Sequence, residues 1–247
     1  MRSAAGPHAP SRRLSLAVWA AFATLVVVGL GAATLRARYL PDLAVRLEPV
    51  RLHGLALFGL GEPNIVRRDA ELRRLDRKYA SHPRATFIHI GLGAVLLALI
   101  PLQFVRRFRD RFRRGHRWIG RTLLIVGGTT GLSGLFFGVL HPFAGAAERV
   151  TILAFGAYFL LAGGIAFARI RAGRSAEHRE WMLRAVAVAL GIATVRVVSA
   201  PLDLVLSSSG ASPQAVFLVA LWIGLGGTVA AGEWWVRRTR SPAFAAT

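Results

Sequence analysis

Six apolar stretches, each about 20 residues long, constrain the fold of this chain more than any other feature. They lie near residues 14–35, 84–105, 119–140, 150–169, 185–206 and 213–236. A helix of about 20 apolar residues crosses the roughly 30 Å hydrocarbon core of a bilayer. Lipid cannot satisfy exposed backbone groups, and no stretch alternates with the period of two of a barrel strand, so all six are expected to be helices. The sequence predicts an all-α, polytopic integral membrane helical bundle that forms a single domain over 1–247.

The composition also favours a membrane. Hydrophobic residues make up 54% of the chain, yet its formal net charge is +20, and a soluble domain needs fewer apolar residues for one core. All but Lys78 of the 32 basic residues are arginines, which gather between the apolar stretches. A nucleic-acid-binding protein would instead carry a basic stripe on a soluble fold. We therefore expect the lipid bilayer as partner and no nucleic acid. Because the chain has no cysteine, disulfides and thiolate metal sites are excluded.

The arginines predict the orientation of the spans. With the N-terminus inside, the cytoplasmic segments hold most of the arginines, and the two short outer loops hold only Arg149. This is the positive-inside pattern, so both termini are expected in the cytoplasm and the protein in the cytoplasmic (inner) membrane. The first apolar stretch is longer than the roughly 7–15 residues of a cleavable signal core, so we interpret it as a retained span.

The segment 36–83 is expected to be an extracytoplasmic loop, and it is the exception to this charge pattern. It holds ten basic residues, offset in part by six acidic ones. Its end, RRDAELRRLDRKYA, sets two leucines three apart among mixed charges, which predicts an amphipathic surface helix. The stretch 53–61 is apolar but too short to span, so it is expected in the interface or over the bundle.

Two related motifs stand at the inner ends of predicted spans, RFRRGHRWIGR at 111–121 and SAEHREWMLR at 175–184. The histidine of each motif, His116 or His178, follows a basic turn and begins an apolar helix. Spans two and three, and then four and five, are therefore a possible repeat of one helical hairpin. The alternative is that any cytoplasmic turn needs arginine for topology and a tryptophan at the interface.

The third span carries a stripe of glycines. At 100° per residue, five glycines share one helix face with His116 and His141; they are Gly120, Gly127, Gly131, Gly134 and Gly138. Such a face predicts that another helix packs very close. The alternative is that a flat cofactor or a lipid tail lies in the groove.

Arg196 is the costliest polar residue in a predicted span. It lies 12 residues past Arg184, about 18 Å along the helix, and is expected near the middle of the bilayer. A charge there costs at least about 2.5–3.5 kcal/mol, so we expect Arg196 to face the bundle interior and to have a partner. The candidate partner is Asp203, about 10.5 Å further along the axis. On the last span, Glu233 is expected to snorkel beside Arg237.

Four histidines pair by their predicted depth. On span two, His89 lies near the outer boundary and shares a face with Gln103 near the inner one. His89 matches His141 outside, and His116 matches His178 inside. Haem b can take two axial histidines from facing helices, so these four are candidate haem ligands. Against this, His116 and His141 are 25 residues apart, about 37 Å on a straight helix, and sit at or beyond the boundaries.

Four segments resemble those of domain-of-unknown-function family 2306, an uncharacterised bacterial family of predicted membrane proteins. They are HIGLGAVLLALIPLQF (89–104), GHRWIGR (115–121), EHREWMLR (177–184) and GEW (232–234). The likeness covers about 84–236; it implies a multi-spanning membrane protein and brings no established activity. By resemblance, the positions to carry over are His89, Gln103, His116, Arg117, Gly120, Arg121, His178, Arg179, Trp181, Met182, Arg184, Arg196 and Glu233.

The chain departs from the family pattern at three places. Ile100 precedes Pro101 where the family favours glycine. Ala185 and Val186 stand where it favours Ser-Tyr, so any role for a tyrosine there is absent. His141 has no clear family counterpart, which weakens the outer histidine pair.

The sequence leaves three functions open. The first is binding or transport of an anionic or amphiphilic small molecule or lipid in a polar core lined by histidine and arginine. The second is haem b or quinone-linked electron transfer, and the third is a non-catalytic membrane assembly factor. Whether the protein is an enzyme stays open, although a hydrolase or acyl transferase is disfavoured because no serine elbow, HExxH or glycine-rich phosphate loop is present. The candidate ligand-binding residues are His89, Gln103, His116, Arg117, Arg121, His178, Arg179, Arg184, Arg196, Asp203 and Glu233; the candidate haem ligands are His89, His116, His141 and His178.

Overall fold

Six long helices make up the computed structural model, which describes residues 11–39, 76–207 and 209–240 and the single residues 49, 70, 73 and 74. Each is long and apolar enough to cross a membrane, which confirms the six predicted spans. The helices are α1 (Arg12–Tyr39), α5 (Pro83–Phe104), α7 (Arg113–Leu135), α8 (Gly145–Arg171), α9 (Ser175–Ser207) and α10 (Pro213–Thr239). A short helix, α6 (Arg106–Arg111), joins α5 to α7, and a π-helical turn, η1 (Phe136–Leu140), extends α7. The predicted stretch 53–61 lies outside the described residues, as do six of the 14 residues of the predicted surface helix at 67–80; residues 70, 73, 74 and 76–80 of that segment are described and are helical.

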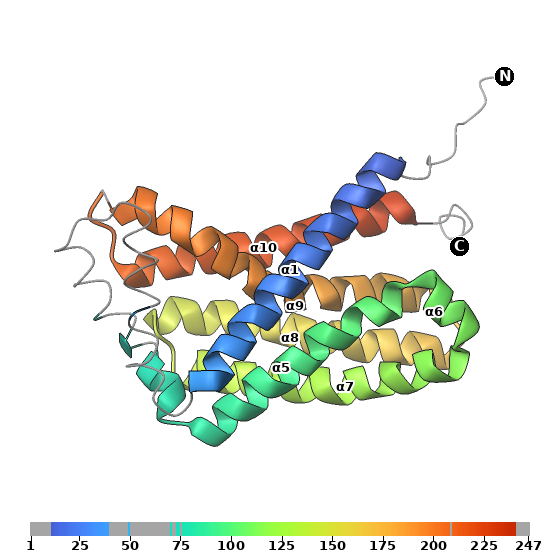
Figure 1. The fold of residues 1–247 in the computed structure, drawn as a ribbon, viewed down its shortest axis with the longest axis horizontal. Coiled ribbons are helices and arrows are strands. Elements are labelled where there is room, and N and C mark those ends of the chain that lie inside the picture. The colour runs from blue at the N-terminus through green and yellow to red at the C-terminus, as the bar shows by residue number, and fades with distance from the viewer. Residues whose placement is uncertain are drawn as a thin grey trace.

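The helices run up and down, so that α1 begins and α10 ends at the same end of the bundle (Figure 1). This end also carries α6 and the α8–α9 turn, and we call it the inner end because the arginine groups gather there. The outer end carries the α9–α10 turn and the connection from η1 to α8. Helix α1 crosses the bundle diagonally and packs on α5 and α9.

The two histidine motifs are helical rather than basic turns followed by helices. Helices α7 and α9 begin before the apolar stretches do, and His116 and His178 are each the fourth residue of their helix. The backbone N–H of each histidine bonds the carbonyl of the residue just before the helix, Phe112 or Arg174. Helix α5 packs on α7, and α8 packs on α9. The two motifs thus hold equivalent places in two packed hairpins, while the repeat itself stays a prediction.

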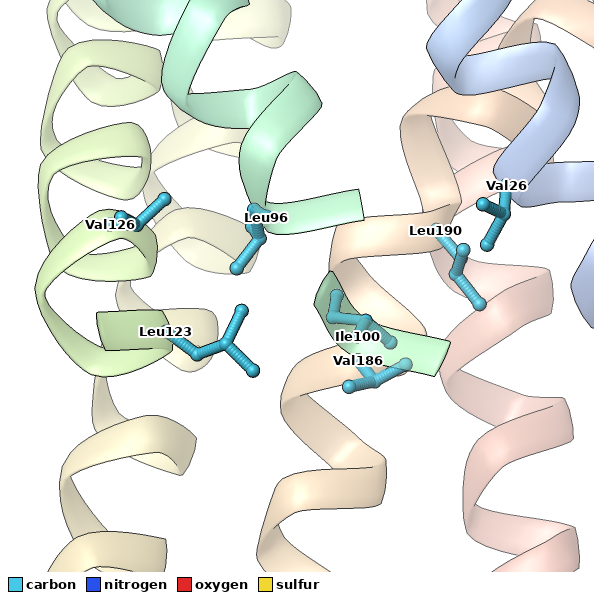
Figure 2. Close-up of a cluster of buried hydrophobic side chains, with 7 residues drawn as sticks. All are labelled: Val26, Leu96, Ile100, Leu123, Val126, Val186 and Leu190. Atoms are coloured by element: carbon cyan, nitrogen blue, oxygen red, sulfur yellow. The ribbon is translucent and has the colours of Figure 1, made fainter. Parts of the chain in front are cut away.

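A first apolar core lies where α1, α5, α7 and α9 meet. Figure 2 shows its seven buried side chains, which are Val26, Leu96, Ile100, Leu123, Val126, Val186 and Leu190. A second core joins α9 to α10 and includes Val195, Leu221 and Leu225. Large apolar side chains also cover the outside: Ile125 is 72% exposed and Val27 is 69% exposed. In a bilayer, lipid tails cover such side chains.

The glycine stripe of α7 lets neighbouring helices pack very close, as expected. A Cβ on Gly131 would lie 2.8 Å from Leu160 of α8, and one on Gly138 would be closer still to Ile152. On the α5 side, a Cβ on Gly127 would lie 3.5 Å from Leu96. Side chains of α8 and α5 therefore fill the groove, and the alternative of a flat cofactor or lipid tail at these positions is wrong.

Candidate functional site

His178 is oriented by a backbone carbonyl. Its Nδ1 lies 2.8 Å from the carbonyl oxygen of Ala166 on α8. Since a carbonyl only accepts, Nδ1 carries the proton, and in the neutral ring Nε2 keeps its lone pair. The turn before α9 makes this possible, because Gly173 takes a left-handed φ of +75° that favours glycine. The imidazole is thereby held between α8 and α9 with Nε2 as its open atom.

His116 and Gln103 each bury a polar atom that has no partner among the described residues. These atoms are Nδ1 of His116 and Nε2 of Gln103. Gln103, at the end of α5, places Oε1 3.6 Å from the position that a Cβ on Gly120 would take, and His116 lies one turn before Gly120 on the same face of α7. Buried polar atoms in proteins are nearly always hydrogen-bonded, and an unmet one costs about 1–3 kcal/mol. Two such atoms on neighbouring helices indicate a place for a ligand.

Positive charge surrounds these atoms. His116 interacts electrostatically with His178 and with Arg109 of α6, and Arg179 interacts with both Arg106 and Arg109. We call Gln103, Arg109, His116, His178 and Arg179 the inner cluster. It draws on α5, α6, α7 and α9, and it contains no carboxylate.

The carboxylates nearest in sequence to the inner cluster are already paired. Glu177 pairs with Arg169 at 3.1 Å and with Arg174 at 3.8 Å. Arg109 contacts its neighbour Asp110 at 3.5 Å, but both side chains are exposed, and such pairs contribute little. Arg179 is also attracted by its neighbour Glu180, which pairs with Arg184 and Arg240 as well. The positive charge of the cluster is thus compensated only in part, by carboxylates that have other partners.

Arg117 and Arg121, which were predicted to bind a ligand, do not join the inner cluster. Both are exposed, and the guanidinium of Arg121 lies 5.3 Å from the ring centroid of Trp118. Trp118 is itself 66% exposed. These side chains lie on the exposed face of α7 at the inner end of the bundle, the level of the membrane interface, where arginine and tryptophan commonly lie.

Arg184 and Glu233 belong to an ion-pair network that joins α9 to α10. Arg184 donates from Nε to Glu233 at 2.9 Å, and Arg237 donates to the other oxygen of Glu233 at 3.1 Å, which confirms the expected Glu233–Arg237 contact. Glu180 is buried and accepts two hydrogen bonds from Arg240, at 3.0 and 2.8 Å. These bonds, with the charge of Glu180, raise the pKa of Arg240. Within this network, Arg184 and Glu233 are ion-pair partners. We call its five residues, Glu180, Arg184, Glu233, Arg237 and Arg240, the α9–α10 clasp.

The outer histidine pair does not form. The Nδ1 of His89 lies 3.0 Å from Oγ of Ser133 and 3.3 Å from the carbonyl oxygen of Thr130. The ring of His141 instead lies 4.3 Å from the ring of His82, centroid to centroid. The prediction assumed a continuous α-helix through His141, but η1 widens the last turn of α7 and changes the direction in which the following residue points. His89 and His141 therefore do not form an axial pair.

Arg196 differs from expectation as well. Its side chain is exposed rather than directed into the bundle core, and it forms no ion pair or hydrogen bond with any described residue. The expected ion pair with Asp203 does not form, because the two residues lie two helical turns apart along α9. Arg196 instead interacts electrostatically with Arg36, Tyr79 and His89.

Comparison with known proteins identifies one family. The family described as "Predicted membrane protein (DUF2306)" matches residues 86–235, well over half of the chain. The chain belongs to this family. No curated protein and no solved structure matches it. The DUF2306 segment begins in α5 and ends in α10, so the inner cluster and Arg196 lie within it, whereas α1 precedes it.

Several residues that organise this DUF2306 protein were not among the predicted site residues. Glu180 could have been found, since it stands four residues before Arg184 on one helix face and pairs with it at 3.7 Å. The contact of Glu180 with Arg240 joins residues 60 apart, and no local signal announces it. His82 is another such residue: it is partly buried and packs on Phe136 and His141.

Proposed function

We propose that the inner cluster binds the anionic group of an amphiphilic molecule. The observation that carries the proposal is the pair of buried atoms without partners, Nδ1 of His116 and Nε2 of Gln103. An oxyanion accepts hydrogen bonds from both when His116 is protonated at Nδ1. Charge supports the same ligand, since an anion offsets the repulsion among His116, Arg109 and Arg179.

The surroundings favour an amphiphile over a small soluble anion. The cluster lies at the inner end of an apolar bundle, beside exposed Leu102 and Val105. An open hollow of about 490 Å³ lies at the α6–α7 joint, lined by two phenylalanines and by cationic side chains. Its lining residues are Phe108, Asp110, Arg111, Phe112, Arg113, Arg114 and Gly115. An acyl chain against such phenylalanines, with its charged group among arginines, satisfies both kinds of surface.

A thermal unfolding experiment tests this proposal. The purified protein is heated in uncharged detergent with dihexanoylphosphatidylglycerol or with the zwitterionic phosphatidylcholine of the same chain length. We expect the anionic lipid to raise the unfolding midpoint of the wild type, and to do so far less for His116→Leu and Gln103→Leu. Arg117→Gln, one residue from His116 but exposed, serves as the matched control and should respond like the wild type. Equal responses to the two lipids, or equal responses of the His116 and Arg117 variants, contradict the proposal.

Haem b is the second candidate ligand, and one observation favours it. The hydrogen bond from His178 to the Ala166 carbonyl leaves Nε2 free, and metal-ligating histidines are commonly held in this way. His116 lies within electrostatic range on the neighbouring α7. An oxidised and a dithionite-reduced absorbance spectrum, recorded after expression with haem supplied, tests this: a Soret band that His178→Leu removes supports haem, and no band rejects it.

The α9–α10 clasp supports a third, non-catalytic role. In this role, Arg184 and Glu233 only stabilise the bundle through their ion pair. If the inner cluster binds neither lipid nor haem, an assembly role is the function that the remaining polar residues support.

A further inference from the structure

Two histidine rings lie in contact at the outer end of the bundle, far from the inner cluster. The ring centroids of His82 and His141 are 4.3 Å apart, and the ring planes are tilted by 45°. His82 directly precedes α5 and His141 directly follows η1, so the contact joins the two outer ends of the α5–α7 hairpin. Phe136 packs beside both rings, at 5.5 Å from His82 and 5.1 Å from His141 between centroids.

His82 is oriented in the way that metal-binding histidines commonly are. Its Nδ1 lies 3.2 Å from the carbonyl oxygen of Lys78 and 3.1 Å from Oγ of Ser81. The Ser81 hydroxyl donates to that same carbonyl at 3.1 Å, so both oxygens accept from His82 and Nδ1 carries the proton. Nε2 is then the open atom of the neutral ring. A carbonyl on the second nitrogen fixes the tautomer and the ring orientation of a histidine ligand.

His141 supplies a second open imidazole. Its ring nitrogens form no hydrogen bond with any residue that the structure describes, and the side chain is only partly buried, so water reaches it. Burial, and the charges of His82 and Lys78, lower the pKa of the ring, which keeps it in the neutral form that binds metals. The π turn of η1 sets the position of His141, and such turns are frequent at functional sites.

The spacing of the two rings fits imidazoles bound side by side to one metal. With metal–nitrogen bonds of about 2.0–2.1 Å, two rings held at right angles have centroids roughly 4.5 Å apart, and two rings in a tetrahedral site roughly 5 Å apart. The observed 4.3 Å is closer to the first value. Right angles between nitrogen ligands are typical of Cu²⁺ and Ni²⁺, whereas Zn²⁺ prefers a tetrahedron. Of these three metals, Cu²⁺ binds nitrogen ligands most tightly.

The charged groups at the outer end are already matched, so they do not exclude a cation. Lys78 pairs with the buried Glu148 at 3.3 Å, and Arg36 pairs with the buried Asp76 at 3.6 Å. No group of three histidine, aspartate or glutamate side chains among the described residues could hold a metal. The two histidines would therefore be the only described side chains on the ion, and water would fill its remaining positions.

We propose that Nε2 of His82 and one ring nitrogen of His141 bind a Cu²⁺ ion at the outer end of the bundle. The ion links the start of α5 to the end of η1, and its open positions face the partly exposed edge of His141. The site is separate from the inner cluster and does not rest on the function proposed for that cluster.

The first test uses the wild-type protein alone. Protein without an affinity tag is purified in uncharged detergent, stripped with EDTA and dialysed, and then titrated with Cu²⁺ from glycine buffer. We expect one Cu²⁺ ion per chain, with an electron paramagnetic resonance spectrum that shows coupling to two imidazole nitrogens. This measurement needs no variant, so it holds even if a substitution prevents folding. Absence of a bound ion, or coupling to a single imidazole, leaves the pair as an aromatic contact and overturns the proposal.

Variants then locate the ion. His82→Phe and His141→Phe keep an aromatic ring beside Phe136 and remove the nitrogens, so each is expected to weaken Cu²⁺ binding at least about tenfold. His116→Leu removes a histidine of the inner cluster and should bind Cu²⁺ like the wild type. If the two phenylalanine variants also bind like the wild type, or if His116→Leu weakens binding as much as they do, the ion lies elsewhere and the proposal fails.

A comparison of two other metals tests the ligand type without redox chemistry. A metal that binds only the folded protein raises its unfolding midpoint. Ni²⁺ should raise the midpoint of the wild type but not that of His82→Phe, whereas Mg²⁺, which prefers oxygen ligands, should raise neither. Equal effects of Ni²⁺ and Mg²⁺ on the wild type indicate a general effect of divalent cations and contradict a histidine site.

Discussion

Replacing Gly224 by alanine should separate α9 from α10. At this crossing the two backbones touch, because a Cβ on Gly224 would lie 2.7 Å from the backbone nitrogen of Val195 and 2.9 Å from the carbonyl oxygen of Gly191. Neither atom belongs to a side chain that can rotate away. Ordinary contacts begin near 3.4 Å, so the helices must move apart by roughly 0.5–0.7 Å. A gap of this size loses about a quarter to a half of the attractive energy of each dispersion contact between α9 and α10.

The expected loss of stability follows from the side chains that are buried between α9 and α10. Ala220, Leu221 and Leu225 of α10 are almost fully buried there against α9. Overpacking of this kind costs about 1–3 kcal/mol, which exceeds the gain of at most about 1 kcal/mol that alanine brings over glycine in a helix. Gly224→Ala is therefore expected to be less stable than the wild type by about 1–2 kcal/mol.

Gly227→Ala is the matched control, three residues further along α10. Nothing lies within 4 Å of a Cβ built there, so this variant should equal or slightly exceed the wild type in stability. Both are measured by SDS titration in mixed micelles, followed by far-ultraviolet circular dichroism and by the fluorescence of the α10 tryptophans. If the two variants unfold at the same SDS fraction, the inference that backbone contact at Gly224 holds α10 in place is wrong.

Three further predictions use other parts of the molecule. Glu180→Gln should lower stability by about 1–3 kcal/mol, because it removes the buried charge to which Arg240 donates two hydrogen bonds. Its control, Asp110→Asn at an exposed pair, should change stability by less than about 0.5 kcal/mol. The same SDS titration compares the two variants. Burial, and the charges of His82 and Lys78, lower the pKa of His141, so the unfolded chain binds the proton more readily than the folded one. The contribution of His141 to folding stability is therefore full above the unfolded pKa of about 6.5. It is lost as the pH drops below that value. His141→Phe should flatten that fall in thermal unfolding recorded from pH 7 to pH 5, and an unchanged slope argues against the His141 account. Gly173→Ala should cost about 1 kcal/mol, because alanine is strained at a φ of +75°; Gly163→Ala, where a Cβ meets nothing, is its control, and equal midpoints count against it.

The bundle was predictable because lipid imposes a simple rule on the sequence. A run of about 20 apolar residues must be helical in a bilayer, whatever it packs against, so six spans could be placed without knowing their neighbours. The glycine stripe of α7 was equally readable, since glycine leaves room for close packing, here by Leu160 and Ile152.

The polar contacts were harder to predict because they depend on helix phase and on partners far along the chain. One π turn was enough to move His141 away from His89 and toward His82. Arg184 finds its partner Glu233 49 residues away, on a helix whose rotation the sequence does not specify. The inner cluster was easier, since His116 and His178 mark equivalent places in α7 and α9 and Gln103 shares their depth.

The close crossing of Gly191 and Gly224 bears on how this protein moves. Together with the clasp at the inner end, it ties α9 and α10 at two levels, so these helices are expected to travel as one rigid body. Any rearrangement must then occur as tilting of α5 and α7 against that body. His116 belongs to the tilting pair and His178 to the rigid one, so the separation of their imidazoles would report each such movement at the inner end.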